Sequence, residues 1–143
     1  MSYDVQQDLG DHDAVVDSHG LTDKLGDGSN IVVNIRFKFK DGELGNKDLY
    51  PCASEKSLEI TRKSLRAMGF DIDKRDIGEL QENQTLLKGA AVRLVVGEHE
   101  YKGNVTNQIQ WINAIQKPAP KSALSALTQK LRNVKKSNAE EAL

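Results

Sequence analysis

Three basic side chains alternate along the most regular strand pattern of the sequence. Arg36, Lys38 and Lys40 are two residues apart, so in a β-strand they point to one face at intervals of about 6.6 Å. Such a row of cations can bind the successive phosphates of an extended nucleic-acid strand. A solvated outer face of a sheet has the same pattern, and the spacing by itself does not separate the two interpretations.

Residues 97–103 carry one aromatic and one further basic candidate, and the glycines at both ends predict a tight hairpin connection. Tyr101 can stack on a base, a contact typically worth ~1–3 kcal/mol, and Lys102 can bind a phosphate. Glu98 and Glu100 oppose phosphate binding by charge repulsion. A tyrosine in a hairpin can also serve only as a packing partner across the strands.

Trp111 and Tyr50 are aromatic side chains that suit either a core or a binding face. Trp111 is the only tryptophan and lies among the amides Gln108, Gln110 and Asn113. We expect Trp111 in the core, because a lone tryptophan commonly anchors one. Facing a groove instead, Trp111 and Tyr50 would offer stacking surfaces to bases.

No catalytic or metal-binding pattern is found in the sequence. The motifs G-x-S-x-G and H-E-x-x-H and the phosphate-binding loop are absent. The lone Cys52 excludes an internal disulfide and a cysteine-built zinc site. His12, between two aspartates, and His19 match no known spacing of metal ligands. We therefore expect neither an enzyme nor a cofactor.

The composition and the distribution of charge fit one small domain with tails. The chain has 143 residues, 38% of them hydrophobic, and a formal net charge of −1. Residues 1–30 hold seven aspartates and one lysine, whereas residues 31–120 hold 14 bases and 12 acids, so a basic surface can exist locally. No apolar run approaches the ~18 residues of a membrane span, and no secretory signal is visible at the start. We expect a cytoplasmic protein that does not enter a membrane.

The elements that must position these side chains are five strands and one helix. Alternation and turn residues predict strands over residues 14–20, 31–40, 44–52, 90–96 and 104–114. Between the third and fourth strands, Ser54 is expected to cap a helix over residues 55–68 that ends at Gly69. Its buried face is predicted to comprise Leu58, Thr61, Leu65 and Met68.

The order strand-strand-strand-helix-strand-strand is that of the OB-fold, a partly open five-stranded barrel that binds oligonucleotides or oligosaccharides. We therefore expect a mainly β protein with one inserted helix, built as an OB-like barrel over residues 11–117. A flexible acidic N-terminus over residues 1–10 precedes it. An open α+β sheet with the helix packed on one face is the alternative architecture.

The tail over residues 118–143 begins with Pro118 and Pro120 and is predicted to hold an amphipathic helix or to be flexible. Its apolar residues recur at helical spacing at Leu124, Leu127, Leu131 and Val134. An isolated helix of this length is marginal in water. We therefore expect it to pack on the domain, pair with another copy of the chain, or fold on a protein partner.

Four runs carry a resemblance to a known family. They are SEKSL at residues 54–58, KSLRAMGFD at 63–71, LKGAAVRLVVGEHEYKG at 87–103 and IQWIN at 109–113. Over residues 11–115 the sequence resembles small bacteriophage proteins of replication and recombination gene clusters, a family that looks like OB-fold single-stranded DNA-binding proteins. The resemblance implies sequence-tolerant binding of single-stranded DNA during phage replication or recombination, in the cytoplasm of the host cell.

Together these observations predict a single-stranded DNA-binding protein without a catalytic site. The candidate DNA contacts are Arg36, Lys38, Lys40, Tyr50, Arg93, Tyr101, Lys102 and Trp111. Proteins of this kind often recruit replication or recombination proteins through an acidic tail, and here only Glu140 and Glu141 supply acid near the end. The alternative function is a protein-interaction or assembly module that acts through the C-terminal helix.

Overall fold

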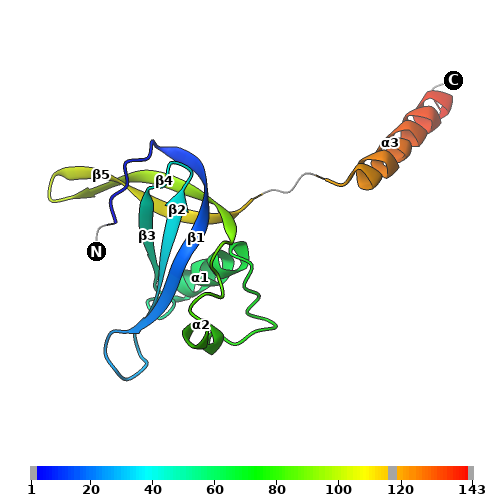
Figure 1. The fold of residues 1–143 in the computed structure, drawn as a ribbon. Helices are drawn as coiled ribbons and strands as arrows, with labels where there is room; N and C mark the ends of the chain where they lie inside the picture. Colours follow the sequence, from blue (N-terminus) through cyan, green and yellow to red (C-terminus); the bar gives the residue numbers. More distant parts are fainter. Residues whose placement is uncertain (1–2, 116–118, 142–143) are drawn as a thin grey trace.

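The computed structural model describes residues 3–115 and 119–141. Within them, five strands form one antiparallel sheet in the order β3-β2-β1-β4-β5, accompanied by three helices (Figure 1). The strands are β1 Gly10–Asp23, β2 Ile31–Phe39, β3 Leu44–Leu49, β4 Ala91–Tyr101 and β5 Asn104–Ala114. The helices are α1 Glu55–Ala67, α2 Gly78–Glu82 and α3 Lys121–Glu141. The expected mainly β chain with a helix between the third and fourth strands is confirmed, and α2 is an additional short helix in the same connection.

Strand β1 joins the two halves of the sheet. Its first half pairs with β4 from Gly10 to Val15, and its second half pairs with β2 as far as Asp23. A register shift between Val16 and Ser18 marks a bulge, which bends a strand and increases its twist. The strand is longer than the predicted residues 14–20, because polar residues at its start pair with β4 and extend it beyond the apolar alternation.

The five-stranded sheet is open, which is compatible with the expected partly open barrel but does not establish an OB-fold. Among the described residues, no pairing joins β3 to β5, the two edge strands, although they approach each other. The N-terminal segment lies in contact with both edges. Val5 is buried and donates its backbone N–H to Asn107 O of β5 at 2.8 Å, while the Tyr3 hydroxyl donates to Asp48 Oδ2 of β3 at 2.5 Å. Residues 3–7 therefore bridge the two unpaired edges.

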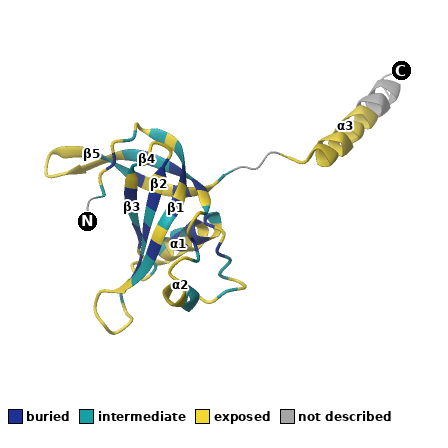
Figure 2. Ribbon diagram, viewed as in Figure 1, coloured by how far each residue is buried: buried dark blue, intermediate teal, exposed yellow. Residues whose placement is uncertain are grey.

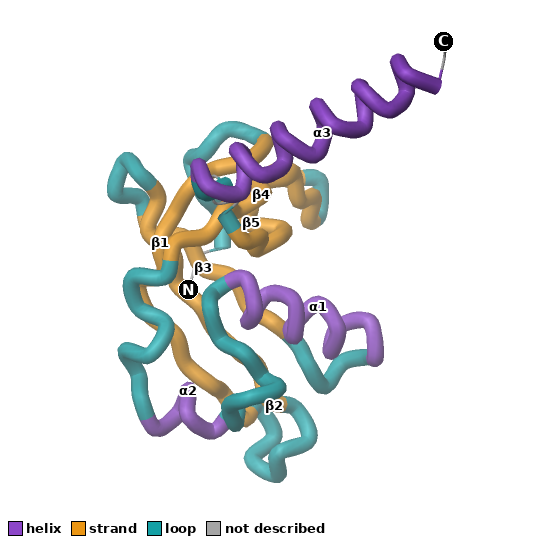
Figure 3. Tube along the Cα trace, turned by 90° about the vertical axis from the view of Figure 1, so that its right-hand side faces the viewer, coloured by secondary structure: helices purple, strands orange, loops and turns teal. Residues whose placement is uncertain are grey.

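The core lies between the inner face of the curved sheet and the α1–α2 region. Figure 2 shows buried residues along the central strands and exposed residues over α3 as far as residue 134. Phe37, Ile35 and Val33 of β2 are fully buried, as their alternation predicts. Helix α1 lies near β3 and β5, and α2 lies beside β1 (Figure 3).

The predicted ends of α1 are confirmed by their hydrogen bonds. The Ser54 side chain accepts a hydrogen bond from Ser57 N at 3.0 Å, as an N-cap does. Gly69 has φ +85°, and Phe70 N donates to Leu65 O at 2.9 Å, which ends the helix and buries Phe70. Leu58 is the exception on the predicted buried face, because its side chain is 56% exposed.

The last two strands differ from prediction at their connection. Most of residues 97–103, predicted as a loop, belongs to β4, and only Lys102 and Gly103 form the turn, with φ of 51° and 81°. Two successive positive φ values are typical of the tight turns that follow the twist of a hairpin. β3 ends at Leu49, before Pro51, rather than at residue 52.

The predicted C-terminal helix is confirmed, and α3 stands away from the sheet (Figure 1). The side chains of residues 121–134 are all exposed. None of the helices in residues 3–115 and 119–141 combines the length and the apolar character that a membrane crossing requires.

Candidate nucleic-acid interface

The basic residues of β2 lie on the face opposite the core, as their spacing predicts. Arg36 pairs with Ser18 of β1 and Asn46 of β3, and its Nε donates to Asn46 Oδ1 at 3.2 Å. Lys38 is exposed. No carboxylate lies within ion-pair distance of either side chain among the described residues. Arg36 and Lys38 therefore present positive charge on the outer face of the sheet.

Lys40 and Arg93 share one carboxylate at the edge of this face. Asp13 Oδ1 accepts a hydrogen bond from Arg93 Nε at 3.1 Å, and Asp13 Oδ2 lies 3.5 Å from Lys40 Nζ. The hydrogen bond from Arg93 holds the pKa of Asp13 below its usual value, and the charge of Lys40 acts in the same direction. A phosphate must compete with Asp13 for both cations.

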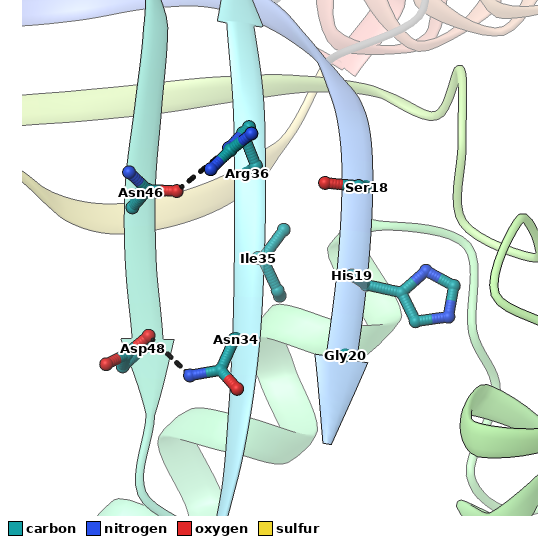
Figure 4. A pocket seen from close by; sticks show the side chains of 8 residues that line it. All are labelled: Ser18, His19, Gly20, Asn34, Ile35, Arg36, Asn46 and Asp48. Carbon is teal, nitrogen blue, oxygen red and sulfur yellow. Dashed lines mark hydrogen bonds between the residues drawn. The ribbon is translucent and has the colours of Figure 1, made fainter. Parts of the chain in front are cut away.

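A polar hollow of about 240 Å³ crosses β1, β2 and β3 on the outer face (Figure 4). Two cross-strand rows line it, Ser18–Arg36–Asn46 and Gly20–Asn34–Asp48. Asn34 Nδ2 donates to Asp48 Oδ1 at 2.9 Å, so a chain of amide and carboxylate groups lies beside the guanidinium of Arg36. These groups can form hydrogen bonds with bases or sugars.

The structure brings Tyr50 and Trp111 together in one hollow. This hollow, of about 320 Å³, lies between the end of β3, α1 and β5, and its lining includes Lys47, Thr61 and Gln110 as well as the two aromatic side chains. Tyr50 is 46% exposed and Trp111 is 48% exposed. Two stacking surfaces, an ammonium group and an amide thus share a site beside the basic sheet face.

The expected core position of Trp111 is wrong, and a bulge is the reason. Val95 pairs with Trp111 but Val96 pairs with Ile109, so Gln110 is an extra residue in β5. An extra residue shifts the alternation of the strand. Ile109 and Ile112 are therefore the buried residues, and Trp111 faces solvent with Gln110.

Lys47 and Tyr3 are candidate residues that the sequence analysis missed. Both line a further hollow of about 380 Å³ between β3 and β5, with Tyr50, His99, Gln108 and Gln110 among its other residues. Burial lowers the pKa of the Lys47 ammonium group, and the nearby charge of Asp48 opposes that shift. The strand alternation could have indicated Lys47, because it lies on the same face of β3 as Gly45 and Leu49, which are buried. Tyr3 carries no local signal.

Tyr101 and Lys102 do not join this site. They lie at the tip of the β4–β5 hairpin, where Tyr101 is 65% exposed and the Lys102 ammonium group lies 5.4 Å from its ring centroid. Tyr101 pairs with Asn104. Trp111 is seven residues further along β5, which corresponds to about 23 Å of strand.

His12 and His19 have structural contacts. His12 Nε2 lies 2.6 Å from Asp8 O, and its ring packs edge-on against Phe39. The His19 ring points away from the polar hollow, and its Nε2 lies 3.0 Å from Leu80 O of α2 (Figure 4). In the part of the chain that the structure describes, no three His, Cys, Asp or Glu side chains gather as a metal site.

No protein-family model matches the sequence, and a search of the curated proteins finds no significant match.

Proposed function

We propose that the protein binds single-stranded DNA, without sequence preference, across the outer face of β1, β2 and β3 and into the Tyr50–Trp111 hollow. The observation that carries the proposal is the convergence of these two half-exposed aromatic side chains beside a basic and amide-rich sheet face. Proteins that bind single strands combine a cationic groove with aromatic surfaces on which bases stack. A stacked base contributes similar energy whatever its identity, which supports sequence tolerance.

The arrangement of the sheet supports an OB-like architecture. In such folds a five-stranded sheet curls so that its first and last parts approach, and the face of the second and third strands binds the oligonucleotide. Here β3 and β5 approach each other, with residues 3–7 between their edges. The polar hollow lies on that same β2–β3 face.

The contacts of the basic side chains favour phosphate binding by the cations of β2 over phosphate binding by Lys40 and Arg93. Lys38 is exposed and Arg36 is half-buried, and neither side chain has a carboxylate partner among the described residues. Lys40 and Arg93 are held by Asp13. We assign the principal phosphate contacts to Arg36 and Lys38, and the base contacts to Tyr50 and Trp111. A role in phage replication or recombination, which the resemblance implies, belongs to the same proposal.

Trp111 provides the direct test, because it is the only tryptophan of the chain. Titration with an oligo-dT of about 30 nucleotides, roughly twice the largest site of one OB fold, should quench its fluorescence. Raising the salt concentration should reverse the quenching, and duplex DNA should compete poorly. Absence of binding at low salt would refute the proposal.

The charge contribution is tested with Arg36→Glu combined with Lys38→Glu. Loss of two phosphate contacts should make the negative slope of log affinity against log salt less steep by about 1.4, since each contact to a single strand contributes ~0.7 to its magnitude. The matched control, Lys63→Glu with Lys74→Glu, makes the same charge change at exposed positions outside these hollows. Equal effects of the two variants would contradict a localised site.

A protein-interaction or assembly module is the second candidate function. It is favoured by the exposed apolar residues of α3, namely Leu124, Leu127, Leu131 and Val134. Truncation after Pro120 should abolish partner binding and leave DNA binding intact. The double variant of Arg36 and Lys38 should do the reverse.

A further inference from the structure

An apolar groove lies beside α1, separate from the polar face. It has a volume of about 420 Å³, and its apolar lining comprises Pro51, Leu58, Leu65, Ile72 and Ile77. Leu58 lies on the helix face that is expected to be buried, yet it is 56% exposed. An amphipathic helix ordinarily buries its apolar face. Here the described residues leave part of that face of α1 uncovered, as one wall of a concave apolar surface.

Charged residues at this groove are mainly acidic. Glu55 and Glu59 line it together with Arg62. The guanidinium of Arg62 is bound to Asp73, with Nη2 at 2.7 Å from Oδ2. Glu59 lies 3.5 Å from Lys63 in an exposed pair, which water screens strongly. An amphipathic helix with basic flanks would complement this rim.

Helix α3 has that character. Its apolar residues Leu124, Leu127, Leu131 and Val134 are spaced by three and four positions, so they form one stripe, and each is about half exposed or more. From residue 119 to 139 the sequence contains five bases and no acid. Lys130 flanks the stripe on one side and Lys121 on the other. The chain therefore carries both an acidic-rimmed apolar groove and a basic amphipathic helix.

We propose that α3 of one copy docks in the α1 groove of a second copy. This inference deepens the second candidate function and does not depend on DNA binding. Pairing of α3 with α3 of a second copy is disfavoured, because the apolar stripe of α3 spans only two heptads and Lys130 would have no acidic partner in such a pair. Docking within one chain is disfavoured, because α3 stands away from the sheet and from α1 (Figure 1).

Light scattering over a range of concentrations tests the proposal with the full-length chain. The wild type should form a concentration-dependent dimer. Leu58→Glu in the groove, and Leu127→Glu with Leu131→Glu in α3, should each weaken dimerisation by roughly a hundredfold, because both place a charge in an apolar contact. The matched control, Ser122→Glu with Gln129→Glu, adds the same charge on the opposite face of α3 and should leave the dimer unchanged. Circular dichroism checks that each variant is folded.

A charge exchange tests the orientation of α3 on the rim. Glu55→Lys with Glu59→Lys should weaken dimerisation about tenfold, and Lys121→Glu with Lys130→Glu should do the same. Combining the four changes should restore most of the affinity. Losses that simply add would overturn the assigned contact between α3 and the rim.

Mixing two defective chains distinguishes docking between copies from docking within one chain. The Leu58→Glu chain retains α3, and the Leu127→Glu, Leu131→Glu chain retains the groove, so a labelled mixture should form a heterodimer at concentrations at which neither chain alone dimerises. Three results would overturn the proposal: a wild type that is monomeric at all concentrations, a dimer that survives Leu58→Glu, or variants that fail to complement each other. DNA titration of the same variants should be unaffected, so a failure here leaves the DNA-binding proposal standing.

Discussion

The hydroxyl of Tyr3 donates a hydrogen bond of 2.5 Å to Oδ2 of Asp48, 45 positions away in the chain. Asp48 is buried in β3, and its other oxygen accepts a hydrogen bond from Asn34. Tyr3 thereby connects the N-terminal segment to the strand that lines all three hollows of the candidate interface. The start of the chain therefore supports the site as well as the open edge of the sheet.

Tyr3→Phe is expected to lower the free energy of unfolding by about 1–2 kcal/mol, because it leaves a buried carboxylate oxygen without its donor. Urea denaturation followed by circular dichroism measures the change. Tyr101→Phe at the exposed hairpin tip is the control and should leave the stability unchanged. An equal stability of Tyr3→Phe and wild type would contradict a structural role for this hydrogen bond.

The same pair predicts a loss of stability in alkali. The hydrogen bond to Asp48 raises the pKa of Tyr3 from 10.0 to about 12, because the bond requires the protonated phenol. A raised pKa in the folded state means that the stabilisation is fully present below pH 10 and is lost as the pH rises towards about 12. The stability difference between wild type and Tyr3→Phe should shrink over that range. A difference independent of pH would contradict the assignment.

Gly45 is expected to tolerate no side chain. A Cβ atom there would lie 2.9 Å from Val5 Cγ1 and 3.0 Å from both Ile109 Cδ1 and Phe39 Cε2. Gly45→Ala should therefore destabilise the fold by about 1–3 kcal/mol through overpacking. Gly20→Ala is the matched control, since a Cβ atom at Gly20 meets nothing within 4 Å and its backbone needs no positive φ. Thermal unfolding compares the two variants.

Trp111→Ala should weaken binding of single-stranded DNA roughly tenfold to a hundredfold, because base stacking on an aromatic side chain contributes ~1–3 kcal/mol. Its effect on stability should be smaller than that of a buried aromatic residue, since Trp111 is 48% exposed. Tyr101→Ala serves as the comparison, and we expect a weaker effect on affinity because Tyr101 lies outside the shared hollow. Fluorescence anisotropy with a labelled oligo-dT gives both affinities.

Asp13→Asn should strengthen DNA binding at low salt by about threefold, because it releases Lys40 and Arg93 for phosphate. The gain should disappear as salt screens the added charge. An unchanged affinity at low salt would place Lys40 and Arg93 outside the DNA path.

The contact between Asp13 and Arg93 also depends on pH. Arg93 keeps the pKa of Asp13 below its ordinary value, so the stabilisation by this ion pair is fully present above the ordinary pKa and is lost as the pH falls through the lowered pKa.

Local patterns in the sequence were sufficient to predict the strands and helix ends that depend only on their own residues. Strict alternation predicted β2, because a strand buried on one face needs that period. Ser54 and Gly69 predicted both ends of α1, because capping and a left-handed terminus depend on residues within one turn. The alternation of Arg36 and Lys38 likewise placed both side chains on the outer face.

Tertiary structure decided the features that depend on strand register and on distant partners. The bulge at Gln110 turned Trp111 out of the core, and a bulge is set by pairing with β4 rather than by β5 alone. The meeting of Tyr50 with Trp111, and of Tyr3 with Asp48, joins residues whose separation along the chain hides their contact. The sequence thus determined the local elements and the outward position of the basic side chains of β2. The Tyr50–Trp111 hollow and the uncovered groove at Leu58 depend instead on the curvature of the sheet and on the packing of α1 beside it.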